Sequence, residues 1–245
     1  VVTIRSALQI RNSLPYDVSA HLDNGEVIGP IPEDCTFSVP LKEANGVNFL
    51  ALKPSFLPSS LSTEISCADR PSDFMSIHNV QCVMKSDEKS YLSLNALVRQ
   101  RDKSIHVSVF PHALIFNALP CSVKFKFTNS AGDVVDQDYL DTGESRKLCF
   151  LSLKENNFVS LQLSSSAWSP VQSLNRQRDS NLTIPLYSCG KLILKIYMKV
   201  SYLNTNTSKI EIFTKCAFVD YSRLNIVLSS VIDGSLQLPV VQSTY

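Results

Sequence analysis

Hydrophobic and polar residues alternate along most of this chain, which is typical of β-strands because successive strand side chains point to opposite faces of a sheet. The alternating segments are short, rich in β-branched and aromatic residues, and separated by turn-forming sequences such as DNGEVIGPIPED and NSAGD. They lie at residues 1–5, 17–22, 47–52, 91–98, 105–110, 122–127, 158–163, 191–200, 209–213 and 223–228. Many short strands of this kind predict an all-β fold made of tandem antiparallel β-sandwich repeats.

One short pattern occurs twice. Residues 8–22 read LQIRNSLPYDVSAHL and residues 113–127 read ALIFNALPCSVKFKF, so both hold Asn-x-Leu-Pro, with an Ile before it and a Val after it at the same spacing. A weaker third copy begins near residue 208 and carries Asp220 where the others have Asn. Repetition at a domain-sized spacing of about 105 residues predicts tandem units. We expect one β-sandwich repeat at 1–104 and another at 105–207. Residues 208–245 would hold the opening strands of a third repeat, or strands that complete the preceding module.

The repeated asparagines, Asn12 and Asn117, each stand at a strand end, shortly before a Pro that cannot donate to a sheet ladder. A side-chain amide both donates and accepts hydrogen bonds, so it can replace a missing backbone partner. Two interpretations follow: the Asn closes a structural β-corner, or its amide contacts the backbone of a bound peptide.

The composition and charge of the chain narrow the range of functions that we expect. The 245 residues are 44% hydrophobic and 18% charged, with a formal net charge of +1. A nearly balanced charge gives no electrostatic reason to expect a nucleic-acid partner. No segment approaches the roughly 20 consecutive apolar residues that span a bilayer. The chain begins in mid-pattern, and we expect it to be a fragment of a larger protein.

The seven cysteines are scattered, odd in number and never spaced Cys-x-x-Cys. This arrangement is typical of reduced thiols in a cytoplasmic protein rather than of a disulfide framework. Two glycosylation sequons, at Asn181 and Asn206, favour the alternative of a secreted adhesion-type sandwich.

Catalytic and metal-binding patterns are nearly missing from the sequence. The four histidines stand at 21, 78, 106 and 112, outside any His-x-x-x-His or His-Glu context, and there is no Gly-rich phosphate loop and no Gly-x-Ser-x-Gly turn. We therefore expect no enzymatic activity, no cofactor and no metal site.

Tandem all-β units that each open with a hydrophobic-x-Asn-x-Leu-Pro stretch resemble the adaptor-binding domain of the vacuolar protein sorting thirteen family of bridge-like lipid transporters. The resemblance spans essentially the whole chain and is sharpest at 8–22 and 113–127. It places the characteristic Asn of that family at Asn12 and Asn117, while the third copy departs from the pattern with Asp220.

The resemblance implies a non-catalytic, cytoplasmic module that binds short Pro-x-Pro motifs of organelle adaptors. Through these adaptors it would place a large lipid-transfer protein peripherally at organelle membranes and contact sites. Asn12, Asn117 and Asp220 would then contact the peptide or support its site. The chain has a Pro-x-Pro of its own at 30–32, which we interpret as part of a turn.

Two further functions stay open. A module that binds lipid head groups directly needs a basic patch, for which residues 98–106 and 173–180 are the candidates. Both segments are interpreted as solvated loops, which disfavours this function. A purely structural spacer would bind no peptide at all.

Overall fold

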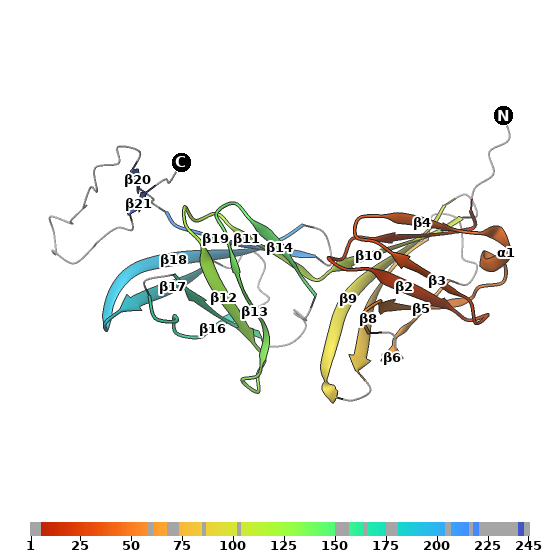
Figure 1. The fold of residues 1–245 in the computed structure, drawn as a ribbon, viewed down its shortest axis with the longest axis horizontal. Coiled ribbons are helices and arrows are strands. Elements are labelled where there is room, and N and C mark those ends of the chain that lie inside the picture. Colours follow the sequence, from red (N-terminus) through yellow and green to blue (C-terminus); the bar gives the residue numbers. More distant parts are fainter. Residues whose placement is uncertain are drawn as a thin grey trace. The chain divides into compact units, whose positions relative to one another are not determined.

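The computed structural model describes residues 6–57, 61–67, 74–84, 87–101, 104–149, 157–163, 166–174, 181–203, 207–215, 218–220 and 240–242. The strands expected at 1–5 and 223–228 lie outside these residues. The chain divides between His112 and Ala113 into two compact units, which are drawn in red to yellow and in green to blue in Figure 1.

The first unit consists of two sheets. One has six strands in the order β4-β1-β10-β9-β8-β6, and the other has four in the order β3-β2-β5-β7. The strands are β1 (Leu8–Asn12), β2 (Val18–Leu22), β3 (Val27–Ile31), β4 (Thr36–Val39), β5 (Phe49–Pro54), β6 (Leu61–Ser62), β7 (Glu64–Ser66), β8 (Met75–Met84), β9 (Asp87–Arg101) and β10 (Ser104–Pro111). A short helix, α1 (Leu41–Ala44), connects β4 to β5.

The second unit repeats this plan. A five-stranded sheet has the order β14-β11-β19-β18-β17, and a four-stranded sheet has the order β13-β12-β15-β16. The strands are β11 (Ala113–Asn117), β12 (Val123–Thr128), β13 (Val134–Leu140), β14 (Ser145–Leu148), β15 (Asn157–Gln162), β16 (Gln172–Leu174), β17 (Asn181–Ser188), β18 (Lys191–Tyr202) and β19 (Ser208–Phe213). Two short strands, β20 (Phe218–Asp220) and β21 (Val240–Gln242), pair in parallel beyond them.

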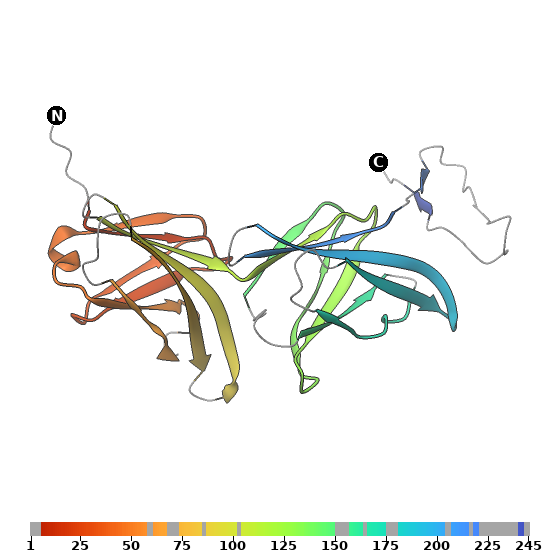
Figure 2. The ribbon, with the colours of Figure 1, turned by 180° about the vertical axis from the view of Figure 1, so that it is seen from behind.

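A shared hydrophobic core makes the second unit a sandwich. Phe125 and Phe127 of one sheet are fully buried in the same cluster as Ile184 and Ile196 of the other. Each core strand presents every second residue to this cluster, as the burial of alternate residues along β11 shows. Figure 2 shows the two layers of each unit from behind. The prediction of tandem antiparallel β-sandwiches is thereby confirmed.

In each sandwich, the first strand pairs in parallel with the strand of its own sheet that comes last along the chain. Ile10 of β1 lies opposite Val107 of β10, and Ile115 of β11 lies opposite Ile210 of β19. The strand at 104–111, which the sequence repeat puts at the start of a second repeat, therefore completes the first sheet. In the same way β19 belongs to the sheet of the second unit.

The Pro-x-Pro at 30–32, interpreted from the sequence as part of a turn, instead contributes Pro30 and Ile31 to the end of β3. Gly29 has φ +126°, and a Cβ at this position would stand 3.0 Å from the carbonyl oxygen of Val18. Only glycine fits such a close approach of two backbones without strain. The register between β2 and β3 shifts at the same place, between Val18 and Ala20.

Candidate functional site

Asn12 closes a corner at the end of β1. Its side chain is fully buried, and its amide nitrogen donates to the carbonyls of Tyr16 at 2.7 Å and Ile31 at 2.9 Å. Its side-chain oxygen accepts from the backbone N–H of Leu14 at 2.9 Å. One amide thus holds the strand end, the turn after it and the end of β3 together.

Asn117 repeats this corner in the second unit. It is fully buried, its amide nitrogen donates to the carbonyls of Cys121 at 2.9 Å and Leu140 at 3.1 Å, and its oxygen accepts from Leu119 N–H at 3.0 Å. A third acceptor, the carbonyl of Asp141, lies 3.1 Å from the same nitrogen. Two copies of one hydrogen-bond pattern, built from matched sequence positions, show that the Asn-x-Leu-Pro motif encodes a β-corner.

The Leu of each motif lies beneath its corner. Leu14 and Leu119 are 0% and 1% exposed, so the chain turns over a buried side chain. The Pro that follows has no N–H, and the turn therefore leaves one donor fewer to satisfy. Asp220 ends β20 as Asn12 ends β1, but its side chain lies outside the described set.

The corner asparagines fix the ends of edge strands. Leu140 is the last residue of β13 and Ile31 is the last residue of β3, and each strand lies at the edge of its sheet. An edge strand presents unpaired N–H and C=O groups, to which an added strand can bond. The geometry therefore connects the repeated motif to an edge strand in each unit.

Not all edges are equally open. β17, with eight residues, and β3, with five, are long edge strands, but they contain Pro185 and Pro30. A proline in an edge strand removes an N–H that an added strand could use. Among the described residues, β13 is the longest edge strand without a proline, at seven residues.

The side chains of β13 are mixed in character. Val134 and Tyr139 are 55% and 57% exposed, so apolar surface lies along this edge. The backbone N–H of Tyr139 donates to the Asp138 side chain at 2.8 Å, so it faces away from the ladder with β12. Backbone groups at every second residue of a strand share one side, which directs the N–H of Gln137 outward as well.

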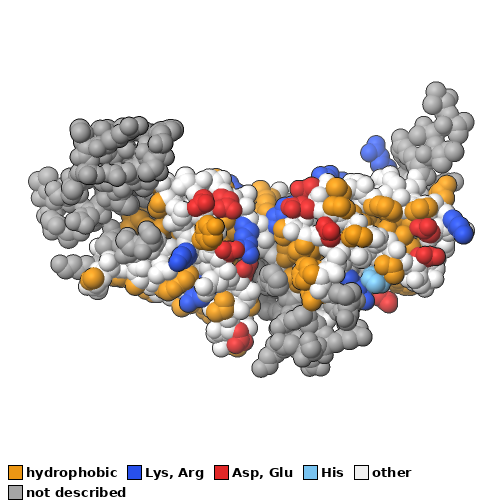
Figure 3. Space-filling model, viewed as in Figure 1, with side chains coloured by type: hydrophobic (Ala, Val, Ile, Leu, Met, Phe, Trp, Pro, Cys, Tyr) orange, Lys and Arg blue, Asp and Glu red, His pale blue; other side chains and the backbone are white. Residues whose placement is uncertain are grey.

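Charged groups lie at the same edge. Arg146 of β14 forms ion pairs with Asp136, at 3.6 Å, and with Asp138. The Asp136 side chain is only 7% exposed. Burial raises the pKa of its carboxyl, and Arg146 and the backbone N–H of Gln137 only partly oppose this shift. The face drawn in Figure 3 shows charged and hydrophobic side chains interspersed in both units.

A buried polar network in the first unit resembles a catalytic triad in residue types alone. The ring of His112 lies 2.8 Å from Ser93 Oγ and 3.0 Å from Asn95 Nδ2. The amide of Asn95 donates to Nδ1, so the ring proton lies on Nε2 and is donated to Ser93, the reverse of nucleophile activation. All three residues are at most 4% exposed, and we interpret them as a structural network.

Other site types find no support in the part of the chain that the structure describes. There, no group of three or more His, Cys, Asp or Glu could hold a metal ion. No helix among those residues has the length and apolarity to cross a membrane. The sequon at Asn181 is exposed at the start of β17, and the one at Asn206 lies outside the described residues.

Sequence reasoning found the corner residues but not the edge that they hold. Neither Gln137 nor Tyr139 carries a sequence signal, because a strand becomes an edge only when the sheet order is known. The absence of Pro between two turns was the one available indication.

The comparisons with known proteins agree with this architecture. Residues 1–233 match the family model described as Vacuolar-sorting associated protein 13, adaptor binding domain. No curated protein matches the chain. The family match covers nearly all of the chain, including both Asn corners, and the chain therefore belongs to the family of Vacuolar-sorting associated protein 13 adaptor binding domains.

Proposed function

We propose that this chain is a non-catalytic interaction module that binds short Pro-x-Pro segments of organelle adaptors at the outer edge of β13. Adaptor binding follows from the family. We choose this edge because β13 is long, lacks proline and ends at the Asn117 corner. In the cell, such binding would hold a large cytoplasmic lipid-transfer protein at membrane contact sites.

The chemistry of a Pro-x-Pro ligand suits such an edge. Residues i and i+2 of an extended strand share one side, so two prolines at this spacing direct their missing N–H groups toward solvent. The residue between them keeps its N–H and C=O and can pair with Gln137, whose N–H would exchange the Asp136 carboxyl for a ligand carbonyl. The exposed side chains of Val134 and Tyr139 offer apolar contacts for the proline rings.

The supporting role of Asn117 follows from the same geometry. It does not reach the surface, since its side chain is fully buried. It would act on peptide binding by keeping the end of β13 in place. The equivalent edge in the first unit contains Pro30 and is a poorer acceptor of an added strand.

Fluorescence anisotropy with a labelled Pro-x-Pro peptide tests the proposal. We expect saturable binding that is lost when both ligand prolines are replaced by Ala. In the protein, Gln137→Pro removes the outward N–H and should abolish binding, whereas Gln137→Ala keeps that N–H and should bind within about twofold of wild type. Equal binding of the two peptides, or equal loss in the two variants, would refute the proposed edge. A structural spacer predicts no saturable binding.

A further inference from the structure

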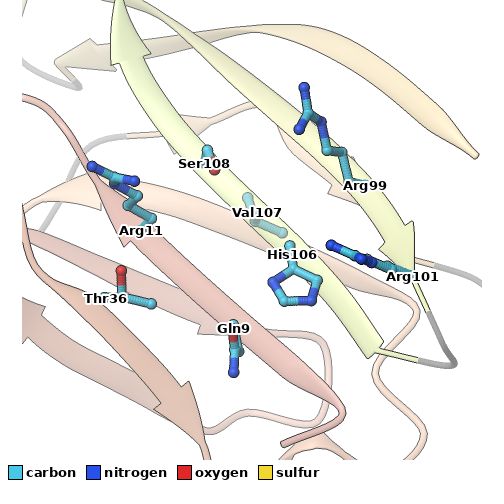
Figure 4. A pocket seen from close by; sticks show the side chains of 8 residues that line it. All are labelled: Gln9, Arg11, Thr36, Arg99, Arg101, His106, Val107 and Ser108. Atoms are coloured by element: carbon cyan, nitrogen blue, oxygen red, sulfur yellow. The ribbon is translucent and has the colours of Figure 1, made fainter. Parts of the chain in front are cut away.

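A cationic pocket lies on the outer face of the six-stranded sheet of the first unit. It is an open depression with a volume of about 310 Å³, lined by Gln9, Arg11, Thr36, Arg99, Arg101, His106, Val107 and Ser108. Figure 4 shows these side chains spread over neighbouring strands, with Arg101 extending toward the ring of His106. The segment 98–106, interpreted from sequence as a solvated loop, instead supplies the ends of β9 and β10 to this pocket.

The sheet register brings these residues together from distant parts of the chain. Arg11 of β1 lies opposite both Thr36 of β4 and Ser108 of β10. On the next row, His106 of β10 lies opposite Arg99 of β9. Strands paired on both sides are rigid supports, so the charged groups are held at a nearly fixed spacing before a ligand binds.

The pocket gathers charge of one sign. Three arginines line it, and no carboxylate is found among the described residues that do so. Such a cluster of cationic side chains attracts a ligand of opposite charge.

The equivalent position in the second unit provides an internal comparison. There, the residues that correspond to Arg11 and Ser108 are Phe116 and Glu211, which lie opposite each other. There, Glu211 also lies opposite Lys199 of β18, and it forms an ion pair with Lys209 at 3.3 Å. The Lys209 Nζ lies 4.9 Å from the centre of the Phe116 ring. The second unit therefore has a carboxylate among its cations at the position where the first unit has the neutral Ser108. This difference is a property of the first unit and not of the repeated fold.

We propose that this pocket binds a small, multiply phosphorylated ligand, the chemistry that a soluble inositol phosphate shares with the head group of a phosphoinositide. Arginine donates paired N–H groups that match phosphate oxygens, and three of them can neutralise more than one phosphate. Thr36, Ser108 and Gln9 add neutral polar groups for hydroxyls. The volume of the pocket lies at the lower end of the range for small-molecule sites, about 300–1,000 Å³, which suits a head group rather than a large ligand.

Calorimetry with the whole chain and soluble inositol trisphosphate tests the pocket. Arg11→Gln combined with Arg99→Gln should weaken binding at least about tenfold, because two charge-assisted contacts are lost. Ser108→Glu, which copies the counter-ion of the second unit, should weaken it as strongly. The control pair Lys195→Gln and Lys199→Gln changes the net charge as much as the arginine pair but alters exposed positions on β18. It should bind within about twofold of wild type.

Vesicle flotation distinguishes the two sources of this chemistry. Phosphatidylcholine vesicles with a phosphatidylinositol bisphosphate are compared with vesicles of equal surface charge that carry phosphatidylserine. Binding to the phosphoinositide vesicles alone identifies the lipid as the source, and binding to soluble trisphosphate without any vesicle binding identifies the free phosphate. No binding to either phosphorylated probe overturns the proposal. So does equal binding to both anionic vesicles, or an equal loss in the lysine control. None of these residues lies on β13, so failure here leaves the peptide edge untouched.

Discussion

The side-chain nitrogen of Asn117 donates a hydrogen bond, 3.1 Å long, to the carbonyl oxygen of Leu140, the last residue of the edge strand β13. In the first unit, Asn12 makes the same bond to Ile31, the last residue of β3, at 2.9 Å. A buried corner amide therefore sets where each edge strand ends. Replacing each asparagine in turn can therefore distinguish the two edges, because β13 lacks proline whereas β3 contains Pro30.

Asn117→Ala should lower both stability and peptide affinity. The substitution removes the donor to several buried carbonyls and the acceptor of Leu119 N–H. Leaving buried groups unsatisfied costs about 1–3 kcal/mol in the free energy of unfolding. Urea unfolding measures this loss, and anisotropy at a temperature where the variant is folded measures binding. A variant of wild-type stability would contradict the described corner.

Asn12→Ala is the matched variant in the first unit. It breaks the same pattern of bonds and should cost a similar amount, about 1–3 kcal/mol, in urea unfolding. Because β3 carries Pro30, we expect peptide affinity to stay within about twofold of wild type. An equal loss of affinity in both Asn variants would mean that the binding site is not confined to the second unit.

Asp136→Asn should alter how stability depends on pH. Burial raises the pKa of the Asp136 carboxyl above its ordinary value of 3.8, so the folded state takes up a proton at a higher pH than the unfolded state does. The charged form therefore destabilises the fold near neutral pH, and this penalty disappears as pH falls through the raised pKa. The variant should be more stable than wild type at about pH 7, with a difference that shrinks toward pH 4. A stability difference between variant and wild type that stays constant between about pH 7 and pH 4 would contradict a raised pKa of Asp136.

The thiols should react in two classes. Cys35 and Cys189 are exposed, whereas Cys67, Cys82 and Cys149 are buried. Burial also raises the pKa of the Cys82 thiol, which lowers its reactive thiolate fraction. We expect a thiol reagent to label the two exposed cysteines in the native protein and the three buried cysteines only after denaturation. Peptide mass spectrometry identifies the labelled residues. Cysteines that stay unreactive after denaturation without reductant would favour the secreted, disulfide-bonded alternative.

The fold class and the corners could be predicted from sequence for physical reasons. Alternation with period two reports which face a residue occupies, and a strand-end Asn before Leu-Pro needs backbone partners that only a turn supplies. These signals are local. They identified the strands that follow the two corners, β2 and β12, and the role open to Asn12 and Asn117.

Strand neighbours could not be predicted in the same way. The alternation of hydrophobic and polar residues does not show that Val107 pairs with Ile10. It therefore does not show which unit contains the strand at 104–111. For the same reason nothing in the sequence places Arg11 and Arg99 around the same pocket, and the basic segment was interpreted as a solvated loop. Edges and pockets arise from sheet order, which depends on contacts between residues far apart in the chain.

The parallel pairing of β1 with β10 has a consequence for how the protein is made. Strand β1 pairs with β4 on one side and with β10 on the other, and these two strands are synthesised at very different times. Val107 of β10, the partner of Ile10, leaves the ribosome about a hundred residues after Ile10. Until then the nascent first unit has β1 exposed on one side, and a fold with such distant contacts forms slowly. We expect ribosome-bound chains that end before β10 to be protease-sensitive and to engage chaperones, and chains that extend beyond it to become resistant in one step.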